Sequence, residues 1–291
     1  MDDQAAELRQ LVRREATPST GPPVRPKLVV VTGGRAGVGA TTIAVNLAVA
    51  LSQRGARGVL VDADARRGSL ATLCDIQEPP LTPAMLTDSH GLDEALQPGP
   101  GGVLVLPGTW ARGDVSEDSA LAQERLIGQL RNLNTVADFI VVDAGAGLGR
   151  LARRFWQVAD LVLPVATADL AVVMDTYASI KVLSGGNDSL TIYPVVNRTK
   201  SPADVVDVHT RLARACLRFL GIRLSGAGSL LDDPRISLST AEPFVLSSPN
   251  QRATLQLHRL AETVAAKTHL TSFDALGVHH ENGGIRLRRR A

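Results

Sequence analysis

The sequence predicts an α/β fold: a doubly wound, mainly parallel β-sheet with helices on both faces. Short apolar runs alternate along the chain with segments whose apolar residues recur at helical spacing. The runs are apolar throughout and do not alternate with polar residues, which is typical of strands covered on both faces. A glycine-rich stretch joins the first run to the first helical segment, a connection common in this architecture.

The expected elements lie in order between Lys27 and residue 270, a span that we interpret as one domain. The expected strands are 28–31, 58–61, 103–106, 139–142, 161–164, 191–196 and 222–224. The clearest helical patterns between them are 41–53, 120–133, 171–183 and 204–220. The connections 75–101 and 107–117 are polar and rich in Pro and Gly, so we expect surface loops there.

Three short segments flank this domain. Residues 1–15 are predicted to form an amphipathic helix, with Ala5, Leu8 and Val12 on one stripe. Residues 16–26, rich in Pro, Gly, Ser and Thr, read as a flexible linker. Residues 271–291 form a basic tail with three arginines at 288–290, directly before Ala291.

Composition limits the class of protein. The 291 residues are 44% hydrophobic but only 3% aromatic, which supports a sizeable core of Val, Leu and Ala. The net charge of +2 gives no sign of nucleic-acid binding. We find no signal peptide and no apolar run near the ~18 residues of a membrane span. Cys74 and Cys216 are expected as buried thiols in a reducing compartment, so a cytoplasmic protein is the expectation.

Residues 31–42 read VTGGRAGVGATT and follow the phosphate-binding pattern G-x-x-x-x-G-K-[ST] without its lysine. Gly34, Gly39 and Thr41 stand at the required positions, whereas Ala40 occupies the place of the lysine. The glycines let successive N–H groups and a helix N-terminus face a phosphate, and Thr41 could bind magnesium. The alternative is a glycine-rich turn that serves packing only.

Polar side chains follow three of the expected strands, at the sheet edge where ligands bind in such folds. Asp62 could hold magnesium through a water, and Asp64 could orient an attacking water. Asp143, followed by Ala-Gly-Ala-Gly, is a Walker B arrangement. Asn197 could read the edge of a nucleobase. The alternatives are strand-end capping for the aspartates and a turn for the asparagine.

In this order the motifs resemble those of the MinD/ParA family of deviant Walker ATPases, whose loop reads K-G-G-x-G-K-[ST]-[ST]. Within the family the chain looks most like the flagellar number regulators of the FlhG type. Residues 3–9, DQAAELR, fit the N-terminal D-Q-A-x-x-L-R activation motif of that branch. The stretches 100–108, 143–147 and 195–212 also resemble it.

The resemblance implies an ATP-dependent homodimer that sandwiches two nucleotides, with ATP or ADP and Mg²⁺ as cofactors. It places Arg35 on the signature lysine that reaches the phosphate of the partner subunit, and Asp64 on the catalytic switch I aspartate. The magnesium ligands would be Thr41, Asp62 and Asp143. The nucleotide-binding residues would be Gly34, Arg35, Ala36, Gly37, Val38, Gly39, Ala40, Thr41, Thr42 and, for adenine, Asn197.

The resemblance also assigns a partner to the N-terminal segment, an FlhF-like GTPase of the signal-recognition-particle type. The partner-activating residues would be Asp3, Gln4, Ala5, Leu8 and Arg9. Gln4 would stimulate the GTPase by arranging its catalytic water. The basic tail could add a weak peripheral contact with the inner face of the cell membrane, or remain a solvated tail.

Both family lysines are absent, because Arg35 and Ala40 replace them. A charge-assisted hydrogen bond contributes roughly 1.5–3 kcal/mol, so the loss of one predicts ATP binding weaker by about one to two decades. Cations facing a transferring phosphoryl group contribute ~10³–10⁵ in rate, so slow or absent turnover is expected. Ala36 replaces a glycine, which requires a negative φ there.

Three functions follow from these features. The leading one is an ATP-binding regulator of the placement and number of a polar machine, most simply the flagellum. The second is a pseudo-ATPase scaffold that keeps the fold for dimerisation only. The third is a pilus-localisation protein of the TadZ/CpaE kind, in which loops without the lysine also occur.

Overall fold

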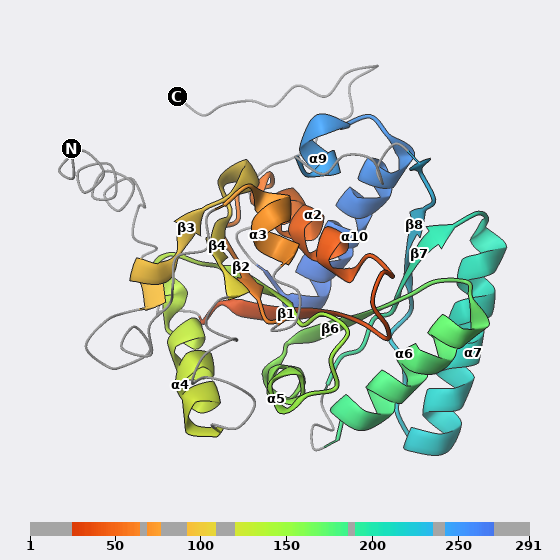
Figure 1. The fold of residues 1–291 in the computed structure, drawn as a ribbon. Coiled ribbons are helices and arrows are strands. Elements are labelled where there is room, and N and C mark those ends of the chain that lie inside the picture. Colours follow the sequence, from red (N-terminus) through yellow and green to blue (C-terminus); the bar gives the residue numbers. More distant parts are fainter. Residues whose placement is uncertain are drawn as a thin grey trace.

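The chain folds around one eight-stranded sheet, shown in Figure 1 as a computed structural model that describes residues 25–64, 69–76, 92–108, 120–185, 190–234 and 242–270. The strand order is β3-β4-β2-β5-β1-β6-β7-β8, and every pairing is parallel except that of β3 with β4. The strands are β1 (Lys27–Gly33), β2 (Gly58–Asp62), β3 (Gln97–Pro98), β4 (Leu104–Leu106), β5 (Phe139–Asp143), β6 (Leu161–Ala166), β7 (Val195–Thr199) and β8 (Gly228–Leu231).

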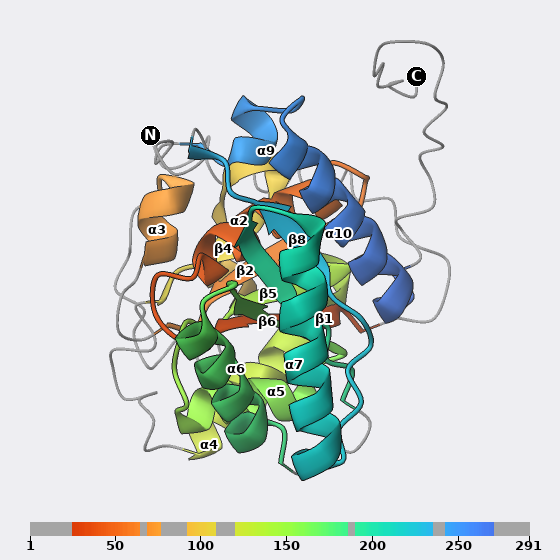
Figure 2. The same cartoon turned by 90° about the vertical axis from the view of Figure 1, so that its right-hand side faces the viewer.

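Helices cover both faces of the sheet, as the two perpendicular views show (Figures 1 and 2). On one face lie α2 (Ala40–Ser52), α3 (Ser69–Cys74), α9 (Phe244–Ser247) and α10 (Arg252–Thr268). On the other lie α4 (Ala120–Arg131), α5 (Arg150–Val158), α6 (Leu170–Leu183) and α7 (Pro202–Leu220). Single 3-10 turns complete the list: η2 (Leu92–Ala95), η3 (Pro100–Gly102) and η5 (Leu133–Thr135). The predicted doubly wound, mainly parallel α/β fold is therefore confirmed.

Burial explains why β2, β5 and β6 carry no polar side chain before their last residue. Every residue of β2, β5 and β6 is buried. Helix α2 is apolar almost all round and has ten buried residues, because it packs against the sheet and against α3, α9 and α10. Both cysteines are buried free thiols, as expected from the sequence.

The positions predicted from the sequence for two of the expected strands are wrong. The apolar run 222–224 is not a strand; Gly221 caps α7 in a left-handed conformation and the Ile222 N–H donates to the Cys216 carbonyl. The last strand is β8 instead, where a Cβ on Gly228 would lie 3.1 Å from Leu260 and 3.3 Å from Tyr193, so glycine gives the strand the room it needs. In the run 191–196, Ile192 makes a single bridge with Val162, and the strand proper starts at Val195.

The expectation of a surface loop over 75–101 is partly wrong. Leu92 and Ala95 in η2 are buried, and β3 pairs with β4 at the edge of the sheet. Gly101, at φ +62°, allows η3 to lie directly on Val49 of α2. The polar composition of 75–101 led to the prediction of a surface loop, although the few apolar residues of this stretch cover the core. Of the second expected loop, 107–117, only the first two residues are described, and both are buried.

Several predicted segments lie outside the described residues. They are the N-terminal helix, all but the last two residues of the linker, and the basic tail 271–291. Among the described helices, none has the length and apolar character needed to cross a bilayer.

Candidate nucleotide-binding site

The glycine-rich loop joins β1 to α2, as the motif requires. The Gly33 N–H and the Thr32 hydroxyl both donate to the Gly145 carbonyl, at 2.8 and 3.0 Å, which ties the loop to the end of β5. Gly37 and Gly39 have φ of +83° and +91°, which only glycine adopts without strain. Gly39 caps α2 without any side-chain hydrogen bond, so the first N–H groups of α2 remain available to an anion.

The two departures within the loop are accommodated locally. Ala40 is 7% exposed, and its methyl carbon lies 3.6 Å from the position that a Cβ on Gly33 would take. Ala36 is not among the non-glycine residues with positive φ in the described part of the chain, so the backbone there tolerates a side chain.

Arg35 is held within its own chain. Its Nε donates to the Asp175 carboxylate of α6 at 2.6 Å, with both side chains partly exposed. The loop also docks on this helix, since a Cβ on Gly34 would lie 2.5 Å from the Thr176 backbone nitrogen. Sequence reasoning missed Asp175, because a single acidic residue within a helix gives no signal before the tertiary contact is known.

Asp62 and Asp143 stand side by side on neighbouring strands, in register and with no exposed surface. Asp62 Oδ1 accepts the Asp64 N–H at 3.0 Å, and Asp143 Oδ1 accepts the Gly145 N–H at 3.1 Å. The second oxygen of each carboxylate has no hydrogen-bond partner among the described residues. Two buried carboxylates with free oxygens form a site suited to a cation.

The environment raises the pKa of both carboxylic acids. Burial, followed by the charge of Asp143, raises the pKa of Asp62 to about 7. Burial raises the pKa of Asp143 to about 6, although the Thr41 hydroxyl and the Gly145 N–H pull that pKa down.

The raised pKa of Asp62 makes stability fall as pH rises. The unfolded chain loses this proton near pH 4 and the folded chain near pH 7, so the contribution of the group is fully present below pH 4 and is lost by pH 7. In magnesium-free buffer, Asp62→Asn is expected to be more stable than the parent, by about 2 kcal/mol more at pH 8 than at pH 5. Urea unfolding across this pH range measures the difference. Asp207→Asn, at a half-exposed position, is the control, and a gap independent of pH would contradict the assignment.

Asp64 lies against the loop that follows β5. A Cβ on Gly145 would come within 2.3 Å of its carboxylate oxygen, so only glycine fits beneath this carboxyl group. The structure thus brings together the ends of β2 and β5 and the glycine-rich loop, which are far apart in sequence.

Asn197 lies inside β7 and supports the loop directly. Its Nδ2 donates to the Val38 carbonyl at 2.8 Å, and a Cβ on Gly39 would be 2.4 Å from the same nitrogen. The next residue, Arg198, has φ of +54°, and the pairing of β7 with β8 is irregular there. The amide therefore positions the loop, while its carbonyl oxygen makes no bond within the described part of the chain.

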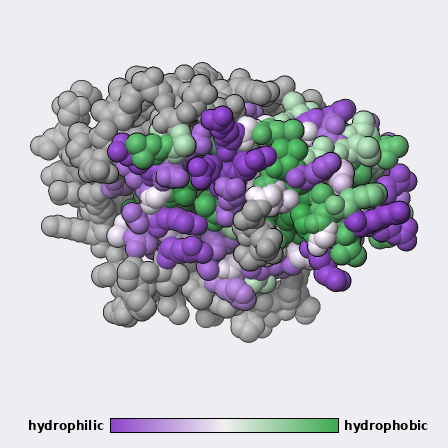
Figure 3. Space-filling view, turned by 90° about the horizontal axis from the view of Figure 1, so that it is seen from below, coloured by the Kyte–Doolittle hydropathy of each residue, from purple (hydrophilic) through white to green (hydrophobic). Residues whose placement is uncertain are grey.

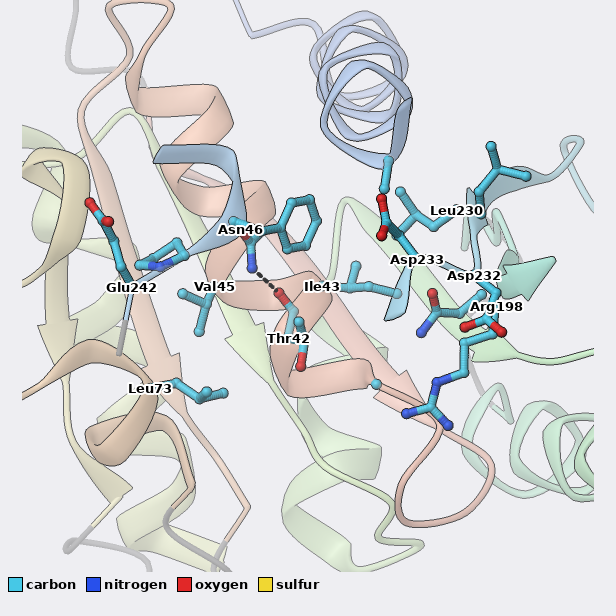
Figure 4. A pocket seen from close by; sticks show the side chains of 16 residues that line it. Thr42, Ile43, Val45, Asn46, Leu73, Arg198, Leu230, Asp232, Asp233 and Glu242 are labelled. Carbon is cyan, nitrogen blue, oxygen red and sulfur yellow. Dashed lines mark hydrogen bonds between the residues drawn. The ribbon is translucent and has the colours of Figure 1, made fainter. Parts of the chain in front are cut away.

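A cavity of about 270 Å³ opens beside the loop, between α2, β8 and α9 (Figure 4). Its volume is near the lower end of ~300–1,000 Å³ for small-molecule sites. Asn46 braces one wall, because its Nδ2 donates to the Thr42 carbonyl and its Oδ1 accepts the Val245 N–H. The lining includes residues that the sequence did not single out: Arg198, Asp232, Asp233, Glu242 and Phe244.

The residues present fit a magnesium-bound nucleotide. A loop with unpaired N–H groups suits the phosphates, and the adjacent cavity suits a nucleoside. No group of three or more His, Cys, Asp or Glu within the described residues could hold a metal ion alone. Mg²⁺ commonly uses one or two carboxylates together with phosphates and waters, which agrees with this arrangement. The partner-activating residues lie outside the described residues.

Comparison with known proteins agrees with the geometry. A model of the CobQ/CobB/MinD/ParA nucleotide binding domain matches residues 29–267. Antiactivator FleN of Pseudomonas aeruginosa is 27% identical over 240 residues, covering 82% of this chain and 86% of FleN. Flagellum site-determining protein YlxH of Helicobacter pylori is 24% identical, covering 83% of this chain and 82% of YlxH. The septum site-determining protein MinD of Synechocystis is 30% identical over a region that covers 76% of this chain and 82% of that protein.

Solved structures show the same fold. The cell division ATPase MinD of Pyrococcus furiosus superposes with a TM-score of 0.64 at 23% identity, covering 82% of this chain and 98% of that one. MinD of Pyrococcus horikoshii, complexed with Mg-ADP, superposes with a TM-score of 0.63 at 22% identity, covering 82% of this chain and 96% of that one. The expected resemblance to the MinD/ParA family is confirmed, and the flagellar proteins FleN and YlxH are among the relatives. The chain belongs to the CobQ/CobB/MinD/ParA family of nucleotide-binding domains.

Proposed function

We propose that this protein is an ATP-binding regulator of flagellar placement and number that acts as a nucleotide-controlled dimer with weak or absent hydrolysis. The observation that carries the proposal is the convergence of the glycine-rich loop with Thr41, Asp62 and Asp143 despite the loss of both family lysines. Such a site retains phosphate and magnesium binding and lacks the cation that accelerates phosphoryl transfer. The likeness to FleN and YlxH supports the flagellar role.

Within this proposal each group of residues has a separate role. The loop N–H groups between Gly34 and Thr42 bind the phosphates. Thr41, Asp62 and Asp143 hold Mg²⁺, which supplies charge neutralisation at the phosphates when bound. Asp64 orients a water, and the free carbonyl oxygen of Asn197 accepts a hydrogen bond from the adenine amino group.

Arg35 is the remaining cation of the loop. Its ion pair with Asp175 is half-exposed, and such pairs contribute only about 0–1 kcal/mol, so the guanidinium can leave Asp175 at little cost. We infer that in the ATP-bound dimer it leaves Asp175 for the phosphate of the partner subunit. Its forked guanidinium suits a phosphate.

The first test is nucleotide binding. Titration of the protein with MgATP and MgADP is expected to give micromolar ATP binding, weakened at least tenfold by Arg35→Ala through the loss of one charge-assisted contact. Arg211→Ala, which removes another half-exposed ion pair, is the control and should bind as the parent does. Equal affinity of the parent and Arg35→Ala would reject the role of Arg35.

A scaffold without nucleotide control is the second candidate, and Ala40 is the observation that favours it. The same titration separates the two functions. Absence of binding at millimolar ATP would reject the proposed regulator and leave the scaffold, whose N-terminal helix would then carry the activity.

The N-terminal motif supplies a separate prediction. Gln4→Ala is expected to abolish the stimulation of an FlhF-like GTPase by this protein, because the amide that arranges the catalytic water is lost. The measurement is GTP hydrolysis by the purified GTPase with and without this protein. Gln10→Ala, in the same segment but outside the motif, serves as the control. Stimulation that survives in Gln4→Ala means that Gln4 does not act on the GTPase.

A further inference from the structure

Asn46 is a polar residue in an apolar place. It is the one polar side chain among the ten buried residues of α2, and it is 3% exposed. Polar residues belong at the surface, where the purple areas of Figure 3 show them, and a buried amide is costly unless it is hydrogen-bonded. Asparagine also favours a helix less than alanine does. A residue that works against its helix in two ways indicates a role beyond the packing of that helix.

The amide of Asn46 joins two segments that are far apart in the sequence. Its Nδ2 donates to the Thr42 carbonyl at 2.8 Å, the dashed line in Figure 4. Its Oδ1 accepts the Val245 N–H at 3.0 Å, across 199 positions of the chain. The Thr42 carbonyl also accepts the backbone N–H four residues later, as in any α-helix, so the helix does not depend on the side chain. The first bond therefore orients the amide, and the second holds α9.

The Val245 N–H depends on Asn46 for its partner. Val245 is the second residue of α9, and the first N–H groups of a helix have no acceptor within it. The following N–H groups, of Leu246 and Ser247, donate to the Pro243 carbonyl. Val245 is 1% exposed, so an unpaired N–H there would be buried. With only four residues, α9 is too short to keep its place by itself, and contacts with its neighbours must hold it.

Helix α9 forms one wall of the cavity beside the glycine-rich loop. Pro243 and Phe244 line the cavity from this side, and Asn46 lines it from α2. A second contact holds the other end of α9, because the buried Thr254 hydroxyl of α10 donates to the Ser248 carbonyl at 2.7 Å. The distance between the two walls is thus set by hydrogen bonds at both ends of α9.

We propose that Asn46 is a positioning residue for the nucleoside, because it holds α9 at the distance from α2 that admits a nucleoside between them. The inference rests on the proposed function, in which the loop binds the phosphates and the adjacent cavity takes the nucleoside. Asn46 then contributes to the binding of the nucleoside part alone. The phosphates bind loop N–H groups whose arrangement does not require the amide.

The test compares two ligands that carry the same phosphates. The full-length protein is titrated calorimetrically with MgATP and with magnesium tripolyphosphate, which has no nucleoside. Asn46→Ala removes the amide and leaves a good helix former. It is expected to weaken MgATP binding about tenfold or more and to leave tripolyphosphate binding within about twofold of the parent.

A conservative variant tests which of the two bonds matters. Asn46→Asp keeps an oxygen for the Val245 N–H and loses the donor to Thr42. Any repulsion between the new carboxylate and phosphates acts on both ligands alike. The ratio of the two affinities is therefore expected to stay near that of the parent, unlike the ratio of Asn46→Ala.

Two threonines of α10 supply a control and a second variant. Thr268→Val removes a buried hydroxyl that donates to the Val264 carbonyl at 2.8 Å, at the opposite end of α10 from Thr254, and should keep the affinity ratio of the parent. Thr254→Val releases the other contact of α9 and should lower the ratio in the same direction as Asn46→Ala. It also replaces Asn46→Ala if circular dichroism shows that this variant does not fold.

Hydrogen exchange tests the positioning without any ligand. The Val245 amide is expected to exchange about tenfold or more faster in Asn46→Ala than in the parent, because its acceptor is lost. Exchange at this amide should be unchanged in Thr268→Val. An unchanged rate in Asn46→Ala would mean that Asn46 does not hold α9.

The titrations separate a failure of this inference from a failure of the proposed function. A parent protein that binds neither ligand would reject the proposed function and the nucleoside role of Asn46 with it. A parent that binds both ligands equally would show that the cavity does not hold the nucleoside. If the parent prefers MgATP and Asn46→Ala weakens both ligands by the same factor, Asn46 acts through the phosphate loop and the inference is wrong.

Discussion

Ala40→Lys is expected to convert this protein into a tighter and faster nucleotide-binding protein. Ala40 is the first residue of α2 and directly follows the loop glycine Gly39, so a lysine there starts at the helix N-terminus that we expect to face the phosphates. One charge-assisted hydrogen bond predicts MgATP affinity higher by about one to two decades, and a cation at the transferring phosphoryl group predicts a rate gain of ~10³. Steady-state ATP hydrolysis and calorimetric titration measure the two effects.

The control for this substitution separates charge from volume. Ala40→Met adds a side chain of similar length without a charge, and it should leave hydrolysis at the parent level. A double variant, Ala40→Lys with Asp64→Asn, should keep the gain in affinity and lose the gain in rate, because Asp64 is assigned to the water. If Ala40→Lys folds and binds ATP no better than the parent, the loop does not hold the phosphates in the proposed way.

Gly39→Ala is expected to damage both folding and binding. At φ of +91° an alanine is strained, and its Cβ would lie 2.4 Å from the Asn197 nitrogen. The strain and the displaced Asn197 amide together predict a loss of about 2 kcal/mol in the free energy of unfolding. ATP binding should weaken more than tenfold, since the loop that presents its N–H groups changes shape. Urea unfolding and ATP titration check the two effects.

Gly128 offers a matched control for this glycine. It lies in α4 with open space around it, so Gly128→Ala makes the same chemical change without a clash. That variant should gain about 0.5–1 kcal/mol from helix propensity and bind ATP normally. Adding Asn197→Ala to Gly39→Ala should recover part of the stability. Equal effects of the two glycine substitutions would show that the backbone at Gly39 has no special constraint.

The sequence was sufficient for the central sheet because its strands are buried on both faces. Runs such as 139–142 and 161–164 need no polar residues there, and their composition reveals them. The peripheral strands were misplaced because their composition does not distinguish them from irregular segments. Leu224 is a buried residue of an irregular segment, and β8 contains only two apolar residues. Composition therefore could not show which of the two segments forms the strand.

The site was predictable where it depends on strand ends and not where it depends on tertiary contacts. Asp62, Asp64 and Asp143 follow apolar runs, and parallel strands bring such ends to one edge. Asp175 belongs to a helix 140 residues from Arg35, and nothing in the local sequence pairs them. The cavity walls at Asp232, just after β8, and at Phe244, the first residue of α9, come from segments whose path only the fold determines.

The raised pKa values of Asp62 and Asp143 also affect the charge balance of a site that has lost its lysine. A lysine would have offset part of the negative charge that these two groups bring opposite the phosphates. In its absence, protons do so, since the pKa values of about 7 and 6 keep part of the pair neutral near physiological pH. Nucleotide without magnesium therefore meets the least repulsion in slightly acidic solution. A divalent ion that enters must displace those protons, so its binding releases acid and strengthens as the solution becomes more alkaline.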